Sequence, residues 1–454
     1  MKKKKIFLQG SLNPSTRLYR NIVETDGGEV LNKVDVNRVV TALKDQGKWD
    51  GVEKMYLGFG GVKTADDGGR TVIETLYDVK SGGDTKETYA GNDRPELHQT
   101  LAGKYQACVE KGATNLCRNS DPATDPGSGL EVTYATNDWG IKYGTHELNG
   151  KVIFGDSSVN RFYRDVERLT NGVMYTAQFL IKPDDGNAPS FGTSSRNIAR
   201  LSVGGTVTSG YTITPYAEGI WHVYVSNVAT TNTSIAGIRK TGSNNDVGFE
   251  ATAIQFEEGS YPTLYIPTTG SAVTRPAPLV PIDNFLPDTG YVGWCGRMVR
   301  DDSLTQFIFD ANTTTHSARR SYISLNSSNQ FVAIAYGVDG GNIAQENPFT
   351  WANNEYKDII AISSWNASTL YLWLCDTDGN LYGYSDDHAI NTDSVRQIAL
   401  ASRSTGIDHS SVRTANIQPG TDIIDTAEKA KTVIEKHTRG SYNLKASEIT
   451  HQNP

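Results

Sequence analysis

The sequence has 454 residues, of which 37% are hydrophobic and 21% are charged, and its formal net charge is −8 at pH 7. This length exceeds one ordinary domain, and the 22 Tyr, 13 Phe and 7 Trp supply too much core material for a disordered chain. The acidic balance argues against a general nucleic-acid binder, because phosphate recognition needs a basic face.

The basic run Lys2–Lys5 is interpreted as a solvated terminal tail rather than a contact for DNA or an acidic partner. Only residues 6–8 are apolar after it, too few for a secretory signal. No apolar run approaches the roughly eighteen residues that span a membrane. Reduced thiols and cytoplasmic synthesis are expected. No C-x-x-C pattern or paired His accompanies the four cysteines, so no zinc site is predicted at Cys108, Cys117, Cys295 or Cys375.

Residues 1–129 combine helical and strand patterns, and we expect them to form a small α+β region. Pro95 and Gly112 are placed as the start and end signals of a helix. The region's expected elements are a helix over 34–43, strands over 52–57 and 72–77, a helix over 95–110 and a connector over 114–129.

Residues 130–275 change to short segments rich in aromatic and β-branched residues, separated by Gly, Asn, Asp or Ser loops. This spacing predicts a first antiparallel β-sandwich of the jelly-roll kind. The expected strands are 152–154, 174–181, 199–203, 211–215, 221–226 and 248–257.

A second β pattern follows a cluster of four prolines within residues 276–288, which predicts a linker without regular structure. Residues 289–421 are expected to form a second jelly roll, and Asp376–Asn380 is expected to be a hairpin turn. Its expected strands are 291–298, 305–309, 321–324, 330–336, 356–363, 370–375 and 381–384. Residues 422–454 are expected to hold a short helix over 422–435 and a polar tail.

Three segments resemble bacteriophage virion proteins with lectin-like modules. The segment AIQFEEGSYPTLYIPTTGSAVTR at 253–275 is similar to the closing strand of carbohydrate-binding-type jelly rolls in phage tail, fibre and capsid-associated proteins. Upstream, YTAQFLIKP at 175–183 and GIWHVY at 219–224 resemble two earlier strands of that module. The segment IAISSWNASTLYL at 360–372 resembles the W-x-x-S-T-L turn of concanavalin A-like domains.

The N-terminal part resembles another pattern of these phage proteins. The segment ALKDQGKWDGVEKMYL at 42–57 looks like the helix and strand that precede their lectin-like domains. TLYDVKSGG with NDRPEL, at 75–83 and 92–97, resembles their LYDxSGxG…NQPEL signature and departs from it at Val79, Lys80 and Gly83. The residues matched in this class are strand cores and turns, so the resemblance implies no catalytic residue.

Motifs for catalysis and metal binding are sparse. Gly155-Asp156-Ser157 matches the start of an esterase triplet, but no D-x-x-H follows near the chain end, and the triplet lies in an expected loop. Asp376, Asp378 and Asn380 superficially match a calcium loop, yet the glycine lies too early for an EF-hand. We therefore predict no cofactor and no metal, although structural calcium in a jelly roll stays open.

Acidic pairs and tryptophans are the remaining candidates. The pairs Glu257-Glu258, Asp301-Asp302 and Asp386-Asp387 offer glycosidase carboxylates, but neighbours on a strand point to opposite faces, so we expect solvated side chains. His222 lies inside a matched strand and is interpreted as structural. A tryptophan ring suits the apolar face of a sugar, and the candidates for such stacking are Trp139, Trp294, Trp351, Trp365 and Trp373.

The interpretation favoured by these patterns is a mainly β, non-enzymatic structural component of a phage particle. It would be a fibre, tail-associated or capsid-decorating protein, made in the host cytoplasm and located in the virion. Its expected partners are other virion proteins, further copies of itself and a host-surface glycan, with no membrane insertion and no nucleic acid. The alternatives are a host-glycan-binding adhesin and a polysaccharide depolymerase. No glycan-binding residues are assigned by the sequence.

Overall fold

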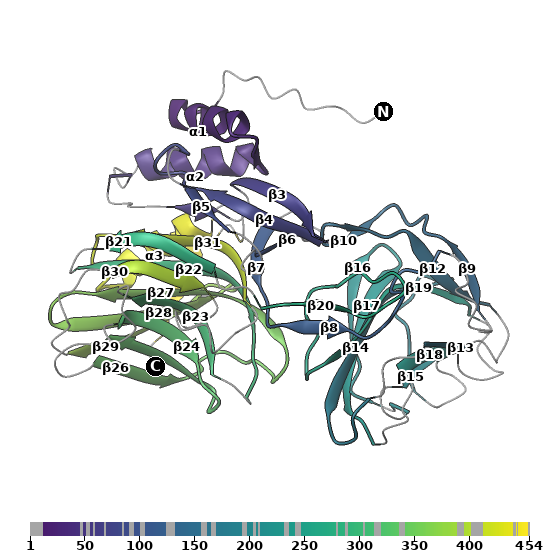
Figure 1. The fold of residues 1–454 in the computed structure, drawn as a ribbon. Coiled ribbons are helices and arrows are strands. Elements are labelled where there is room, and N and C mark those ends of the chain that lie inside the picture. Colours follow the sequence, from purple (N-terminus) through teal and green to yellow (C-terminus); the bar gives the residue numbers. More distant parts are fainter. Residues whose placement is uncertain are drawn as a thin grey trace. The chain divides into compact units, whose positions relative to one another are not determined.

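The computed structural model confirms a mainly β protein with antiparallel sheets and a small helical part near the N-terminus (Figure 1). None of the described helices is long and apolar enough to cross a membrane. The structure describes residues 12–45, 49–50, 55–57, 60–67, 70–83, 86–89, 95–99, 105–123, 132–155, 161–164, 169–192, 198–202, 206–207, 209–230, 236–240, 247–277, 280–286, 289–302, 305–312, 319–335, 341–387, 395–400, 412–438, 442 and 444–452.

The chain divides into two compact units, and one interrupts the other in sequence. Unit 1 contains residues 1–65, 71–111 and 277–454, whereas unit 2 contains residues 112–276 and the short segment 66–70. The sequence pattern predicts residues 112–129 as part of the N-terminal region. In the structure they belong to unit 2, together with the first predicted sandwich.

The N-terminal part of unit 1 packs two helices against strands. The side chain of Asn13 caps α1 by accepting from the Ser15 amide at 3.0 Å, and Pro14 occupies the first helical turn. Tyr19, Val39 and Tyr77 belong to the core beneath both helices. The elements are α1 (Pro14–Thr25), β1 (Glu29–Val30), α2 (Lys33–Asp45), β2 (Tyr56–Leu57), β3 (Gly61–Asp67), β4 (Arg70–Tyr77), β5 (Lys86–Thr88), β6 (Glu96–Gln99) and β7 (Tyr105–Val109).

The rest of unit 1 adds the strands that complete a two-sheet sandwich. One sheet has the order β1-β3-β4-β6-β7-β31-β22-β27-β28-β29-β32, and the second has the order β21-β30-β23-β24-β25-β26. The strands are β21 (Val280–Leu286), β22 (Gly290–Val299), β23 (Gln306–Asn312), β24 (Arg319–Leu325), β25 (Gln330–Ala335), β26 (Gly341–Glu346), β27 (Tyr356–Trp365), β28 (Thr369–Asp376), β29 (Asn380–Asp387), β30 (Val395–Leu400), β31 (Val412–Gly420) and β32 (Thr450–His451).

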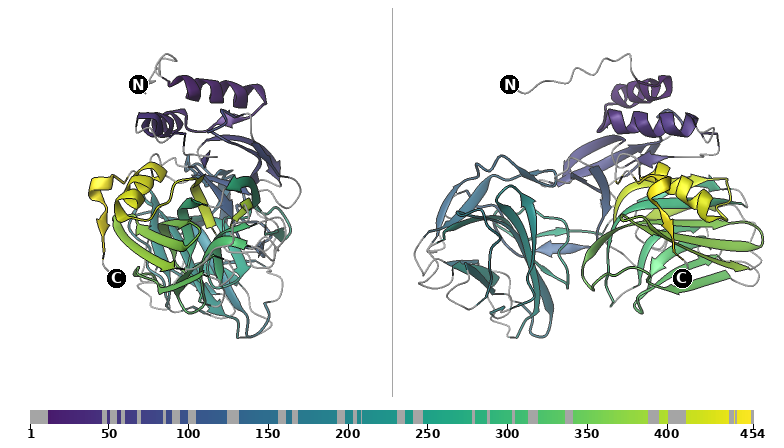
Figure 2. Two further views of the ribbon diagram at one scale, coloured as in Figure 1. Left: turned by 90° about the vertical axis from the view of Figure 1, so that its left-hand side faces the viewer. Right: turned by 180° about the vertical axis from the view of Figure 1, so that it is seen from behind.

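Both faces of the larger sheet are covered where β22, β27 and β28 lie. Trp294 and Ala361 point into the core between the sheets, together with Phe331 of the second sheet. Cys295 and Ile360, their neighbours in sequence, point to the opposite face, where α3 (Ala427–His437) packs on them (Figure 2). These strands are buried on both faces, which explains why they are continuous apolar runs in the sequence.

Unit 2 is a β-sandwich whose main sheet has the order β16-β17-β14-β19-β12-β9. A three-stranded sheet, β13-β18-β15, contributes Phe162, Leu201 and Ile238 to the same core. The strands are β9 (Thr133–Thr136), β10 (Lys142–Tyr143), β11 (His146–Glu147), β12 (Gly150–Phe154), β13 (Arg161–Arg164), β14 (Met174–Pro183), β15 (Ala199–Ser202), β16 (Thr212–Ala217), β17 (Ile220–Val228), β18 (Ala236–Lys240) and β19 (Phe249–Glu258).

The two ends of unit 2 meet. β8 (Ala113–Asn115) pairs antiparallel with β20 (Val273–Arg275), and the hydroxyls of Thr114 and Thr274 lie 2.8 Å apart. The segments by which the chain enters and leaves unit 2 are therefore paired with each other.

Two of the sequence predictions are wrong at the level of secondary structure. Residues 95–110, predicted as a helix, form β6 and β7, because Ala107 and Val109 enter the core at two-residue spacing and β7 pairs with β31. The predicted linker 276–288 contains β21, which pairs with β30. In both places the partner strand is far away in sequence, and tertiary pairing overrides the local helix and proline signals.

The principal predicted strands of both sandwiches are confirmed, as is the hairpin at Asp376–Asn380. There β28 and β29 pair, and the Asp376 carboxylate accepts from the amides of Asp378 at 3.0 Å and Asn380 at 2.9 Å. Gly379 supplies the positive φ of +87° that the turn requires.

Candidate functional site

The outer face of the main sheet of unit 2 carries the best candidate site. On β14, Ala177, Phe179 and Ile181 point into the sandwich core. Gln178, between them, therefore points to the outer face, as do His222 and Tyr224 on the neighbouring strand β17. Core residues therefore alternate with polar or aromatic ones along these strands, except at Leu180, which is buried on the outer face in a smaller apolar cluster with Trp139 and Tyr265.

Four partly exposed rings gather on this outer face, and we call them the aromatic face: Tyr143, Tyr216, His222 and Tyr224. The ring centroids of Tyr143 and Tyr216 are 5.3 Å apart with an interplanar angle of 69°. His222 lies 5.7 Å from Tyr143 and 5.9 Å from Tyr224. The rings are thus in mutual contact and form a continuous surface.

Tyr143 reaches this face from a separate hairpin formed by β10 and β11. The hairpin turns at Gly144, whose φ is +63°, and its residues pack beside Trp139 and Tyr265. The Tyr216 hydroxyl donates to the Lys142 carbonyl at 2.8 Å and accepts from the Gly144 amide at 3.3 Å. Burial raises the pKa of Tyr216 to about 12, so this hydroxyl keeps its proton at neutral pH.

A buried polar network lies beneath the rings and is centred on Glu257. Its carboxylate accepts from the Thr263 amide at 2.8 Å, the Thr263 hydroxyl at 2.7 Å and the Gln255 amide group at 2.9 Å. Burial raises the pKa of Glu257, against the lowering effect of these hydrogen bonds and of the Arg275 charge. The network holds residues 260–266 against the sheet.

Gln178 connects this network to the rings. Its amide nitrogen donates to the Thr263 carbonyl at 2.7 Å, and its amide oxygen lies 3.1 Å from the Tyr143 hydroxyl and 3.2 Å from His222 Nε2. The aromatic face therefore combines ring surfaces with hydrogen-bonding edges held at fixed positions, which suits a ligand with both apolar C–H faces and hydroxyl groups.

The tryptophans considered for sugar stacking are all buried. Their exposed fractions are at most 9%, because each packs into a core: Trp139 9%, Trp294 0%, Trp351 5%, Trp365 0% and Trp373 6%. The partly exposed rings of the outer face are tyrosine and histidine instead. The sequence signal for them is the alternation on β17, where Val223 and Val225 are core residues and His222 and Tyr224 are not. His222, interpreted from the sequence as structural, lies partly exposed on this face.

The acidic pairs do not form a pair of cooperating carboxylates. Glu257 is fully buried and Glu258 is exposed, which confirms that they face opposite ways, but Glu257 is not solvated as expected. Asp301 is also buried, at 5% exposure. The burial of Glu257 is not predictable from strand spacing, because the donors that pair with its carboxylate come from residues whose positions the spacing does not reveal.

Other sequence candidates give no reactive centre in the described part of the chain. Asp156 and Ser157 of the esterase-like triplet lie outside the described residues. Among the described residues, no group of three His, Cys, Asp or Glu side chains is placed to hold a metal ion. The four cysteines are buried, and none of them forms a disulfide.

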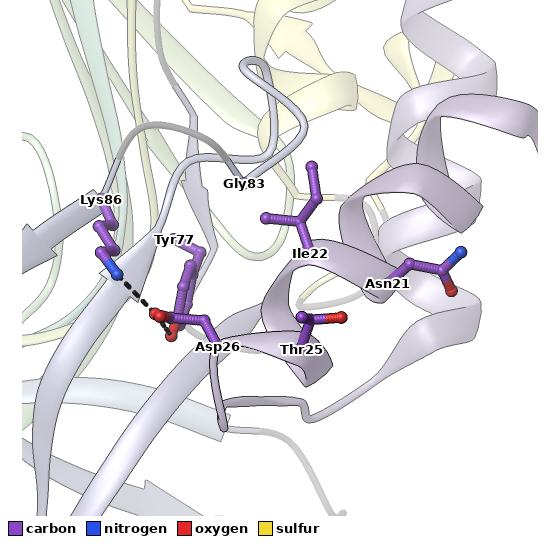
Figure 3. Close-up of a pocket in the computed structure, with 7 residues that line it drawn as sticks. All are labelled: Asn21, Ile22, Thr25, Asp26, Tyr77, Gly83 and Lys86. Atoms are coloured by element: carbon purple, nitrogen blue, oxygen red, sulfur yellow. Dashed lines mark hydrogen bonds and ion pairs between the residues drawn. The ribbon is translucent and has the colours of Figure 1, made fainter.

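A depression of about 410 Å³ lies in unit 1 between the end of α1 and the strands β4 and β5 (Figure 3). Its charged groups engage one another. The Asp26 carboxylate accepts from Lys86 Nζ at 2.6 Å and from the Tyr77 hydroxyl at 2.5 Å. The Lys86 ammonium and then the Tyr77 hydroxyl lower the pKa of Asp26. Because these groups are mutually satisfied, the aromatic face of unit 2 is the stronger candidate.

Comparison with known proteins gives distant similarities only. No protein-family model matches the sequence, and no curated protein sequence is significantly similar to it. The chain is similar in fold to the CBM40 of the Ruminococcus gnavus IT-sialidase bound to α2,3-sialyllactose, with 9% identity, a TM-score of 0.26 and coverage of 32% of this chain and 83% of that chain.

Two further solved structures share this kind of similarity. The LG4-5 domains of the mouse laminin α1 chain match with 9% identity and a TM-score of 0.24, over 66% of this chain and 97% of that chain. The basic lectin of winged bean with Tn-antigen matches with 11% identity and a TM-score of 0.18, over 34% of this chain and 80% of that chain. These are distant matches to lectin-like and carbohydrate-binding β-sandwich domains.

Proposed function

We propose that the protein is a non-enzymatic glycan-binding protein and that the aromatic face of unit 2 binds the saccharide. The observation that carries this proposal is the set of contiguous, partly exposed rings, Tyr143, Tyr216, His222 and Tyr224, held over a buried amide and carboxylate network. Sugar rings stack their C–H faces on such aromatic surfaces, and their hydroxyls reach the polar edges.

Binding is tested with the full-length protein on a panel of bacterial polysaccharides and defined oligosaccharides, followed by calorimetric titration of the best ligand. Replacing Tyr143 or Tyr216 by Ala removes a ring, and we expect a loss of affinity of about tenfold or more. The control is Glu258→Ala, an exposed side chain paired with Tyr175, whose ring lies in the core, so that Glu258 is not on the outer face. Equal affinities for the ring variants and the control would refute the assignment of the site.

We propose separately that the protein does not cleave the saccharide that it binds. Incubation of the protein with any polysaccharide that it binds is expected to release no reducing ends, because the described acidic pairs do not converge on one site. Release of reducing ends above that of a boiled control contradicts a pure binding role and favours the depolymerase.

We further propose that the setting is a phage particle, where the chain is a fibre, tail-associated or capsid-decorating component present in repeated copies. The support is the sequence resemblance at 75–83, 175–183, 253–275 and 360–372. In this setting the glycan belongs to the host surface. Mass spectrometry of purified particles and location of the chain in a density map test this setting, and its absence from particles contradicts it.

A further inference from the structure

The three-stranded sheet of unit 2 brings three arginines into one row across its strands. In the order β13-β18-β15 (Figure 1), Arg161 of β13 lies directly opposite Arg239 of β18, and Arg239 lies directly opposite Arg200 of β15. We call these three positions the arginine row. Neighbouring strands lie about 4.8 Å apart, so the three cationic residues are anchored close together across the sheet.

The arginine row belongs to the face of this sheet that is turned away from the core. Phe162, Ile238 and Leu201 each neighbour one of the three arginines in sequence, and all three are buried in the core of the sandwich. Successive residues of a strand face opposite sides of the sheet, so the arginine positions lie on the other side. Arg239 is partly exposed, and none of the described acidic residues forms an ion pair with it.

The strands that carry the row contain no acidic residue that could balance its charge. Their sequences are RFYR, ARLS and AGIRK, which together hold five basic residues and no Asp or Glu. The formal net charge of the whole chain, by contrast, is −8. Like charges directly opposite each other on neighbouring strands destabilise a sheet. An anion bound at this face would relieve that repulsion.

We propose that the arginine row is a second binding site of unit 2, on the opposite side of the sandwich from the aromatic face. Its ligand carries several closely spaced oxyanion groups, sulfate or phosphate. The guanidinium group is always charged, and its planar fork of N–H donors matches two oxygens of such a group at once. A row of three favours several oxyanions on one compact molecule over a single ion. A long polyanion is disfavoured, because the acidic remainder of the chain repels whatever extends beyond the row.

Calorimetric titrations of the full-length protein test this site with two compact probes, sucrose octasulfate and inorganic tripolyphosphate, and with sucrose as the uncharged reference. In low-salt buffer, we expect at least one probe to bind at least about tenfold more tightly than sucrose. Binding of the octasulfate alone identifies a sulfated saccharide as the source of the oxyanions, and binding of tripolyphosphate alone identifies a phosphate compound. If neither probe binds, or if only a single-stranded oligonucleotide binds, the proposal is overturned.

Substitutions in the row show whether the probe binds there. Arg239→Gln removes the central charge and should weaken binding of the probe about tenfold or more. Arg239→Lys keeps the charge without the planar fork, and we expect a loss of about threefold. The matched control is Arg118→Gln, which removes an exposed arginine of the same unit outside the row and should change the affinity less than about twofold. Equal losses for Arg239→Gln and Arg118→Gln overturn the proposal.

A measurement without any ligand tests whether the arginines of the row repel one another. Salt screens such repulsion, so raising NaCl from about 50 mM to about 1 M should raise the melting temperature of the wild type by roughly 1–4 °C more than that of Arg239→Gln. Arg118→Gln should respond as the wild type does. The same melting curves show whether each variant is folded, and Arg200→Gln replaces Arg239→Gln if the latter does not fold. An equal response of the wild type and the row variant overturns the proposal.

Discussion

Removal of the buried Glu257 carboxylate should destabilise unit 2, whereas an isosteric replacement should be tolerated. In Glu257→Ala the Thr263 amide loses its acceptor in a part of the protein with almost no exposure to water. In Glu257→Gln the side-chain oxygen still accepts from that amide, and the new NH2 group faces the Thr263 hydroxyl, which turns to accept it.

The size of the stability loss depends on how many hydrogen-bonding partners of Glu257 are left without another acceptor. The amide groups of Gln178 and Gln255 keep other acceptors, the carbonyls of Thr263 at 2.7 Å and Leu264 at 3.4 Å. One orphaned buried donor costs about 1–3 kcal/mol, and with the lost packing we expect a total loss of about 2–4 kcal/mol for Glu257→Ala. The loss for Glu257→Gln should stay below about 1 kcal/mol.

Differential scanning calorimetry of the full chain measures the transition of unit 2. For a domain of this size, 2–4 kcal/mol lowers the melting temperature by roughly 4–16 °C. Glu258→Ala is the control, because Glu258 is the exposed neighbour on the same strand and its loss should change stability by less than about 0.5 kcal/mol. If Glu257→Ala melts together with Glu258→Ala, the carboxylate does not organise this face.

Three further predictions concern stability. Burial raises the pKa of the Glu257 carboxyl above its ordinary 4.5, so the folded state holds the carboxyl proton more tightly than the unfolded state does. The stability of the wild type relative to Glu257→Gln should therefore fall as pH rises above about 4.5. Denaturant midpoints of both proteins at several pH values test this, and a difference that does not change with pH contradicts it. Gly150→Ala places a methyl carbon 2.2 Å from the Pro122 carbonyl carbon, and a loss of about 2 kcal/mol or more should appear in the urea midpoint. Arg413→Met removes the cation that lies 2.9 Å from the Glu110 carboxylate, whose side chain is 1% exposed. The free energy of unfolding should fall by about 3–5 kcal/mol. Adding Glu110→Met should restore most of this stability, and the urea midpoint of the double variant checks it.

The sequence predicts those strands whose register is local and whose faces differ. β14 and β17 are recognisable because core residues alternate with polar or aromatic ones. β7 was read as a helix because its partner β31 lies about three hundred residues later, and no window of sequence contains both. α1 was overlooked, although Asn13-Pro14 is a recognised start signal for a helix.

The candidate site was harder to predict than the fold. Tyr143 belongs to a two-residue strand without any periodic pattern, and it meets His222 only because a hairpin folds over the sheet. The role of Gln178 depends on which atoms face its amide, and these come from two segments of the chain. Tryptophan attracted attention as the usual sugar-stacking residue, but the large rings of this protein fill its cores.

The interruption of unit 1 by unit 2 fixes the order in which the two can be completed on a ribosome. Glu110 precedes its partner Arg413 by 303 positions, and β31 must be synthesised before it can fill the place between β7 and β22. Unit 2, whose ends are joined by β8 and β20, emerges whole during that interval. The nascent chain therefore carries a finished module beside an open sheet edge, and release before β31 should yield an aggregation-prone product.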